Sequence, residues 1–161
     1  MAQSSGPDAA TLISDWFNSL GLAETDLRVE QLEADYADVP CYRVFQFRPK
    51  RAGCFELDII VSDDGYWGMG IKHQGHSETV YAWGFEGTTM SCEVVLQIAR
   101  CIAEGQAEIV VNRFQLSKTV GFLELPQQRL RELLGLSRHD KIRQRRKTRF
   151  YQRRFRSLDW Q

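Results

Sequence analysis

The chain has 161 residues, of which 43% are apolar, enough for one globular domain with a hydrophobic core. It has no run of 18 apolar residues, and residues 1–8 lack the features of a signal peptide, so we expect a cytoplasmic protein without a transmembrane helix. The formal net charge is zero, but 10 of the 21 Lys and Arg and only 2 of the 21 Asp and Glu lie in residues 138–161. An acidic body, residues 1–137, therefore precedes a basic tail, residues 138–161.

The first predicted element is an amphipathic helix. Apolar residues recur three and four positions apart from Ala9 to Leu20, with Trp16 in the middle of the stripe. Gly21 can end this helix in the left-handed conformation. Residues 22–40 fit no single period, so a strand and a short helix are both compatible with residues 27–36.

The middle of the chain is rich in β-forming residues. The pattern predicts four strands, over residues 41–48, 54–61, 66–72 and 79–85. Asp64-Gly65 is a strong hairpin signal, because glycine adopts a positive φ without steric cost. Leu57 and Ile59 point to one face of their strand and Glu56 to the other. We therefore expect an antiparallel meander with one buried face.

The second half of the chain adds helices and two further strands. A helix is predicted from Met90 to Ile102, then strands over residues 107–113 and 119–125, and a short helix after Pro126. Ser137 and Asp140 resemble a capping box that opens a final helix through the basic tail. The fold class is therefore α+β: a meander sheet packed against the N-terminal and central helices, with a basic C-terminal helix.

The basic tail carries most of the functional prediction. If it is helical, four arginines share one face: Arg145, Arg149, Arg153 and Arg156. Tyr151 and Phe155 lie on a different face and can anchor the helix on protein. Arginine binds phosphates and carboxylates, and interleaved aromatic residues suit RNA. The same helix fits an acidic protein surface on a partner, on its own domain or on a second copy, and the overall pI of about 6.8 is low for a generic nucleic-acid binder.

Two tryptophans indicate a second candidate surface. Trp67 and Trp83 lie on predicted neighbouring strands that are rich in other aromatic residues. An exposed aromatic patch would mark a binding surface. The alternative is that both faces of the sheet are covered and these side chains are core.

No motif indicates catalysis, a metal or a cofactor. His73, His76 and Glu78 match no zinc spacing, so we predict no bound transition metal. Asp63 and Asp64 fit a turn better than an acid–base pair. The four cysteines form no Cys-x-x-Cys pair, and Cys92 and Cys101 fit an apolar helix face as buried thiols.

We therefore predict a small, non-enzymatic protein-interaction module of the adaptor, inhibitor, immunity or chaperone type. It would bind a partner through the aromatic sheet face, the acidic surface or the basic tail. An RNA-, DNA- or ribosome-associated protein is the first alternative, an enzyme with an unrecognised site the second, and a homodimer is compatible with either. We also expect residues 1–137 to fold without the tail.

Overall fold

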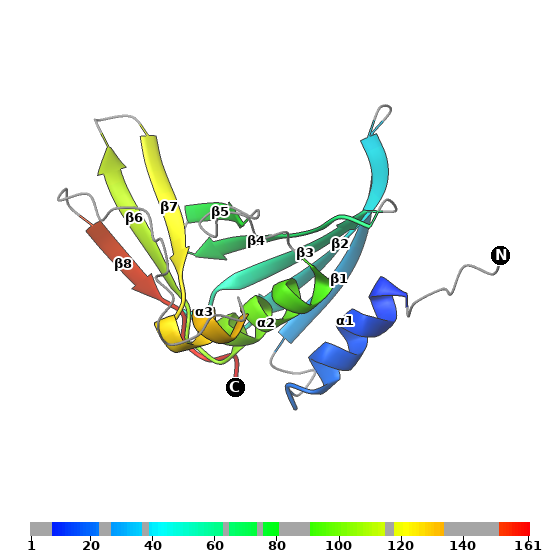
Figure 1. The fold of residues 1–161 in the computed structure, drawn as a ribbon, viewed down its shortest axis with the longest axis horizontal. Coiled ribbons are helices and arrows are strands. Elements are labelled where there is room, and N and C mark those ends of the chain that lie inside the picture. Colours follow the sequence, from blue (N-terminus) through cyan, green and yellow to red (C-terminus); the bar gives the residue numbers. More distant parts are fainter. Residues whose placement is uncertain are drawn as a thin grey trace.

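In the residues that the structure describes, the protein has an α+β fold with two antiparallel sheets (Figure 1). The computed structural model describes residues 8–22, 27–36, 39–62, 65–73, 76–80, 91–114, 118–133 and 152–161. The helices in this part of the chain have 10, 12 and 7 residues, too short to span a bilayer, which takes about 20 residues.

The larger sheet has five strands in chain order, each antiparallel to the next. Its strands are β1 (Leu27–Tyr36), β2 (Val39–Pro49), β3 (Glu56–Ser62), β4 (Trp67–His73) and β5 (His76–Val80). The predicted meander is confirmed for these residues, and residues 27–36 are a strand. The predicted strand over residues 79–85 begins earlier, at His76, and residues 81–90 lie outside the described part of the chain.

The smaller sheet has three strands in the order β7-β6-β8. These are β6 (Glu108–Phe114), β7 (Lys118–Glu124) and β8 (Gln152–Arg156). Strand β8 corrects the sequence prediction, because residues 152–156 of the tail form the edge of a sheet and not a helix. Residues 134–151 lie outside the described residues, so the rest of the predicted tail helix is not described.

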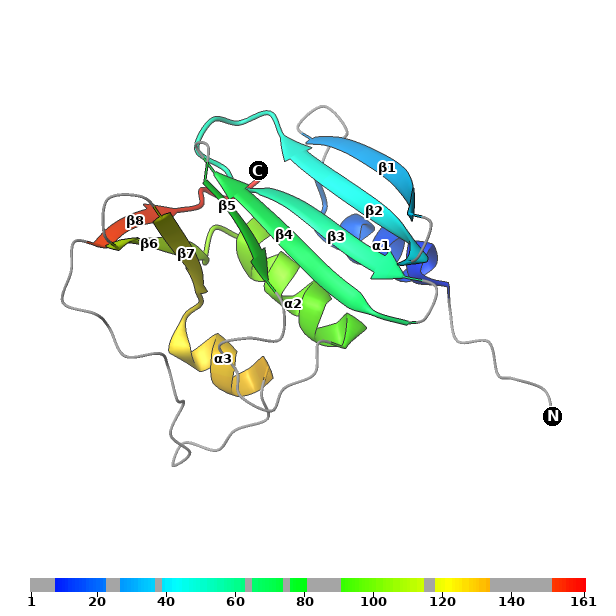
Figure 2. The same ribbon diagram turned by 90° about the horizontal axis from the view of Figure 1, so that it is seen from above.

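Helices α1 (Ala9–Asn18) and α2 (Cys92–Ala103) lie on the same face of the five-stranded sheet, and α3 (Gln127–Leu133) follows β7 (Figures 1 and 2). Ser91 caps α2, since its side chain accepts a hydrogen bond of 3.3 Å from the amide of Val94. Gly21 and Gly105 follow α1 and α2 with φ of 66° and 69°, as expected for glycines that end helices.

The core lies between this sheet and the two helices. Alternate residues of β2, β3 and β4 point toward α1 and α2, as in the row formed by Phe45, Ile59 and Met69. Trp16 of α1 packs edge-on against Phe47 of β2, with ring centroids 5.4 Å apart. Full burial of such side chains supplies the main driving force for folding.

The last residues of the chain are part of this core. The C-terminal segment, residues 157–161, follows β8 and places Trp160 at 1% exposure against Phe47, with ring centroids 6.0 Å apart. Its backbone amides bond to three other parts of the domain: Ser157 to Ala107, Leu158 to Gly53 and Trp160 to Ala103. The tail is therefore not a surface appendage over its last ten residues.

Candidate functional site

The candidate site is the face of the five-stranded sheet that points away from α1 and α2. Seen from above, this face of the sheet lies in front of the two helices (Figure 2). None of its residues on the three central strands belongs to the core cluster. We call these residues the open face: Val44, Gln46, Arg48, Glu56, Asp58, Ile60, Gly68, Gly70 and Lys72.

Four charged side chains form an ion-pair cluster on the open face. Arg48 Nη2 lies 2.7 Å from Asp58 Oδ1, and Arg48 Nε lies 3.3 Å from Glu56 Oε2. Lys72 Nζ lies 3.7 Å from Asp58 Oδ2. Oδ1 of Asp58 is buried, and its approach to Arg48 is an ion pair without hydrogen-bond geometry. Two cations thus meet two anions, and the cluster has no net charge.

The arginine of this cluster is held in place by the backbone as well. Its Nη1 donates to the carbonyl oxygens of Phe47 and Leu57, both at 3.3 Å. The side chain of Arg48 is 21% exposed, whereas Lys72 is 48% exposed. Arg48 therefore sits within the sheet surface, while Lys72 and Glu56 form the accessible part of the cluster.

Next to the ion pairs lies a row of uncharged residues, which we call the apolar strip: Val44, Ile60, Gly68 and, at its end, Tyr66. Val44 and Ile60, both partly buried, lie opposite each other on β2 and β3, and Gly68 continues the row on β4. A Cβ at Gly68 would lie 2.8 Å from the hydroxyl oxygen of Tyr66, so the absence of a side chain lets the Tyr66 ring lie over the sheet. Tyr66 is 44% exposed and provides an accessible aromatic ring at the end of the strip.

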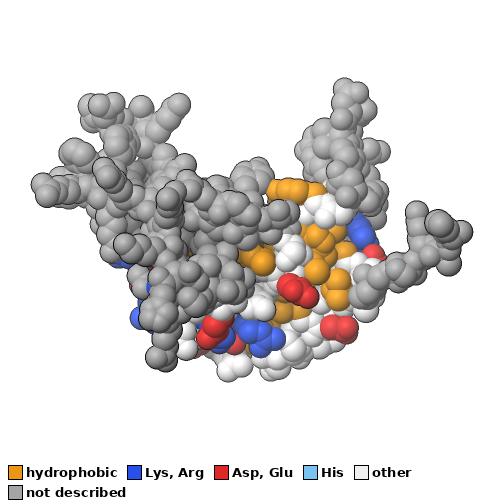
Figure 3. Space-filling view, viewed as in Figure 1, with side chains coloured by type: hydrophobic (Ala, Val, Ile, Leu, Met, Phe, Trp, Pro, Cys, Tyr) orange, Lys and Arg blue, Asp and Glu red, His pale blue; other side chains and the backbone are white. Residues whose placement is uncertain are grey.

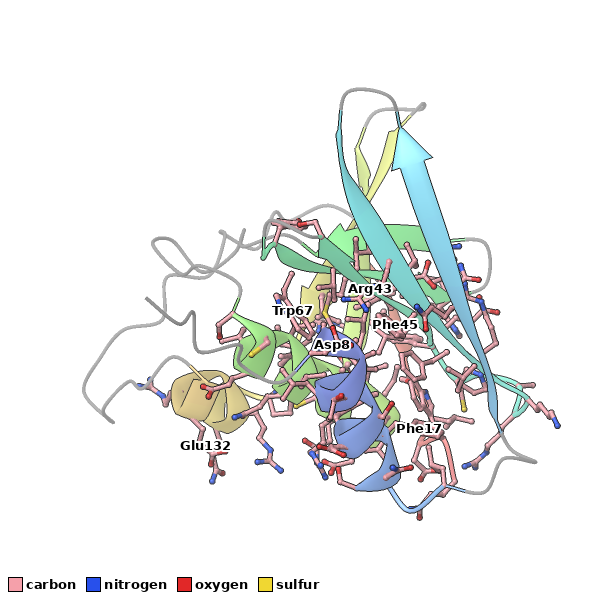
Figure 4. The ribbon with its side chains drawn as sticks, turned by 90° about the vertical axis from the view of Figure 1, so that its right-hand side faces the viewer. Asp8, Phe17, Arg43, Phe45, Trp67 and Glu132 are labelled. Atoms are coloured by element: carbon pink, nitrogen blue, oxygen red, sulfur yellow. The ribbon has the colours of Figure 1, made fainter. Side chains whose placement is uncertain are left out.

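The predicted aromatic patch is not built around Trp67. This residue is 8% exposed and lies in the row of Val61 and Arg43, on the helix-covered face (Figure 4). Trp83 lies outside the described residues. The accessible ring on this part of the sheet is that of Tyr66, the residue before Trp67. Its place directly after the turn signal Asp64-Gly65 is the feature of the sequence that could have indicated its exposure.

The predicted arginine face of the tail does not form within β8. Positions 153 and 156 are three residues apart in a strand, so they belong to opposite faces of the sheet. Arg145, Arg149 and Tyr151 lie outside the described residues. Phe155 is partly buried against His73, with ring centroids 5.3 Å apart.

Two arginines of the tail, Arg154 and Arg156, contact their own domain. Arg154 Nη1 lies 3.1 Å from Glu108 Oε2, and Arg156 Nε donates to the carbonyl oxygen of Gly105 at 3.4 Å. Arg51, between β2 and β3, donates to the carbonyl oxygen of Gln161 at 2.8 Å. These contacts attach β8 and the C-terminal segment to the body.

Of the two histidines near the β4–β5 turn, His73 has a structural role, because it packs in the core. His73 is 7% exposed and lies between Phe55 and Phe155, 4.8 Å and 5.3 Å away between ring centroids. His76 lies opposite it in the β4–β5 ladder. Within the described residues, no three His, Cys, Asp or Glu side chains are grouped as a metal site would require.

A small cavity lies where the ends of α1 and α2 meet the C-terminal segment. Its volume is about 410 Å³, and it is lined by Ser19, Leu20, Leu22, Arg100, Ala103, Glu104, Asp159 and Gln161. Arg100 Nη2 donates to Ser19 Oγ at 2.5 Å, and its Nη1 lies 3.8 Å from Glu104. The cavity thus places an arginine among carboxylates, with no cysteine or histidine in its lining.

The helix side of the domain has a mixed surface. Asp and Glu side chains there lie among Lys, Arg and hydrophobic ones (Figure 3). Where α1 begins, Asp8 pairs with Arg43 of β2 at 3.1 Å, which lowers the pKa of Asp8 (Figure 4). A continuous acidic patch is not seen among the described residues on this side.

Comparisons with models of protein families, with curated proteins and with solved structures found no match.

Proposed function

We propose that this protein is a non-enzymatic protein-binding module that contacts its partner through the open face. The observation that carries this proposal is the juxtaposition of the neutral ion-pair cluster and the apolar strip that ends at Tyr66. Protein interfaces combine an apolar centre with a polar surround and are enriched in Tyr and Arg. The open face has both components side by side on one sheet.

The charge pattern favours a protein over a nucleic acid. Binding to phosphates requires lysines and arginines that are available to replace counterions. On the open face Arg48 and Lys72 are paired with Asp58 and Glu56. A neutral pattern of fixed donors and acceptors is better suited to the mixed polar groups of a protein surface.

Two buried thiols, those of Cys54 and Cys101, are poor candidates for nucleophilic catalysis. Burial raises the pKa of Cys54 and of Cys101, so both remain protonated at neutral pH. The thiolate is the reactive form, and an inert, buried thiol is typical of a structural cysteine.

The proposal can be tested with one charged substitution on each side of the sheet. Ile60→Arg places a long, charged side chain on the apolar strip. Gln97→Arg adds the same side chain at an exposed position of α2, on the helix side. With each protein as bait in a nuclease-treated extract of the native cell, we expect Gln97→Arg to retain the partner proteins of the unchanged chain and Ile60→Arg to lose them.

Urea denaturation of both variants serves as the folding control, and similar midpoints are expected because each side chain can extend into solvent. Equal capture of the same proteins by both variants would contradict the proposal. If the unchanged chain captures partners from an untreated extract but not from a nuclease-treated one, the nucleic-acid alternative is favoured instead.

A further inference from the structure

Strand β1 is an edge of the five-stranded sheet, with β2 as its one neighbour among the described strands (Figures 1 and 2). Its pairing with β2 is regular from Leu27 to Ala34 and shifts before Tyr36. Every second backbone amide and carbonyl of an antiparallel edge strand points away from its neighbour and can pair with another strand. The regular part of β1 is long enough to form such a ladder.

A buried row of side chains ends abruptly at this edge. Val29 lies opposite Phe47, which lies opposite Leu57, which in turn lies opposite Ile71. The last three are at most 1% exposed, whereas Val29 is 46% exposed. An apolar side chain that continues a core row but remains half exposed would gain burial from a further strand beside it.

We propose that β1 pairs antiparallel with β1 of a second copy of this chain, about a two-fold axis at Val29. In such a symmetric pair each residue at a given distance before the axis faces the residue at the same distance after it. The axis at Val29 places the two valines opposite each other and places Arg28 opposite Glu30 of the partner subunit, once on each side. The partner's Val29 then extends the core row across the interface.

Other registers with the axis between positions 28 and 33 are less favourable. An axis at position 28, 30 or 33 places a charged residue opposite its own copy, which is repulsive. An axis at position 31 places Val29 opposite a glutamate, and an axis at position 32 places it opposite an aspartate. The axis at Val29 alone places opposite charges face to face within residues 28–33.

The interface would join the two larger sheets edge to edge. Positions 28 and 30 share the side of the sheet that carries the open face, and position 29 lies on the side of the helices. The two open faces would therefore lie side by side and face the same way. A dimer of this kind presents two copies of the same surface to a bivalent partner.

Charge exchange tests the register. The mass of the full chain is measured by sedimentation equilibrium over a concentration series, and the unchanged chain is expected to dimerise. Arg28→Glu and Glu30→Arg should each raise the dissociation constant about tenfold or more, because each places like charges opposite one another. The double variant R28E/E30R restores opposite charges and should return the constant to within about threefold of the original.

Glu93→Arg, the same charge change at an exposed position of α2, is the control and should leave the constant unchanged. A chain that is monomeric throughout, or a dimer that the single changes do not weaken, would overturn the proposal. A double variant that fails to recover would do the same.

A cysteine cross-link measures the axis independently. With copper phenanthroline as the oxidant, Val29→Cys should form a disulfide between copies, because the two residues face each other. Gln31→Cys, also exposed and on the same face, should not, since it lies opposite Leu27 of the partner subunit. Peptide mapping identifies the linked residues, and efficient linkage at position 31 in place of 29 would overturn the register.

Discussion

The indole Nε1 of Trp160 donates a hydrogen bond of 3.2 Å to the carbonyl oxygen of Phe55, 105 residues earlier in the chain. The ring is 1% exposed and stacks on Phe47. We therefore expect Trp160→Ala to lower the free energy of unfolding by about 3–5 kcal/mol, as is typical for the loss of a large core side chain. Leu158→Ala, in the same segment at 44% exposure, should cost about 1 kcal/mol or less. Urea denaturation measures both, and equal losses would show that Trp160 does not contribute as its burial indicates.

Removal of the whole tail should have a larger effect. A chain that ends at Ser137 lacks both β8, which pairs with β6, and the C-terminal segment, whose Ser157 Oγ accepts a hydrogen bond from the amide of Phe55. The sequence predicts that such a chain folds by itself, but the position of Trp160 leads us to expect the opposite. We predict a broad, weakly cooperative thermal transition and dye binding to exposed apolar surface. A sharp transition near that of the full chain would support the original boundary.

Most of the fold is predictable because its signals are local. The helical period from Ala9 to Leu20 and the alternation along β3 each identify an element without knowledge of the rest. Strand β8 is not predicted because its sequence shows too little alternation. Among its described side chains only Phe155 is apolar, between Arg154 and Arg156, and one apolar residue does not establish a period of two. Spacings of 3 and 4 between arginines indicate a helix equally well.

The open face is predictable only in part. Glu56 and Asp58 occupy the polar side of an alternating strand, and that is visible in the sequence. Their partners Arg48 and Lys72 come from two other strands, and which residues meet depends on the register of each hairpin. Turn geometry decides that register, and the turn residues do not specify it uniquely.

Two of the buried tryptophans, Trp16 and Trp160, offer a matched comparison of one hydrogen bond. Nε1 of Trp16 is buried without a hydrogen-bond partner, whereas Nε1 of Trp160 bonds to Phe55. Replacement by Phe removes similar volume at both sites, but at position 160 it also leaves a buried carbonyl oxygen unpaired. We expect Trp160→Phe to cost about 1–3 kcal/mol more than Trp16→Phe in urea denaturation. A larger loss at position 16 would contradict this.

Two glycines at helix ends provide a test of close packing. Gly21 and Gly105 both have positive φ, so alanine at either position is strained by about 1–2 kcal/mol. A Cβ at Gly105 would also lie 2.8 Å from the backbone nitrogen of Asp159, while a Cβ at Gly21 would meet nothing within 4 Å. We expect Gly105→Ala to lose about 1–3 kcal/mol more than Gly21→Ala, because the backbone of the C-terminal segment must shift. Similar losses in thermal melts would show that this segment moves freely.

The buried thiols predict a loss of stability at alkaline pH. Burial raises the pKa of Cys54 and of Cys101 above the ordinary value of 9.0. Well below pH 9.0 the thiols are protonated in both the folded and the unfolded chain, so their contribution is constant. Above it the unfolded chain releases these protons first, and the free energy of unfolding falls until the folded pKa is passed.

Cys101→Ala removes one of these thiols and so isolates its contribution to the pH dependence of the unfolding free energy. The difference in unfolding free energy between the unchanged chain and this variant should therefore shrink as the pH rises from 8 to 10, although other groups titrate in both proteins. Alkylation followed by peptide mapping provides a second measurement, in which the partly exposed Cys92 should react before Cys54 and Cys101. A pH-independent difference together with rapid alkylation of Cys101 in the folded chain would show that its thiol is accessible to solvent.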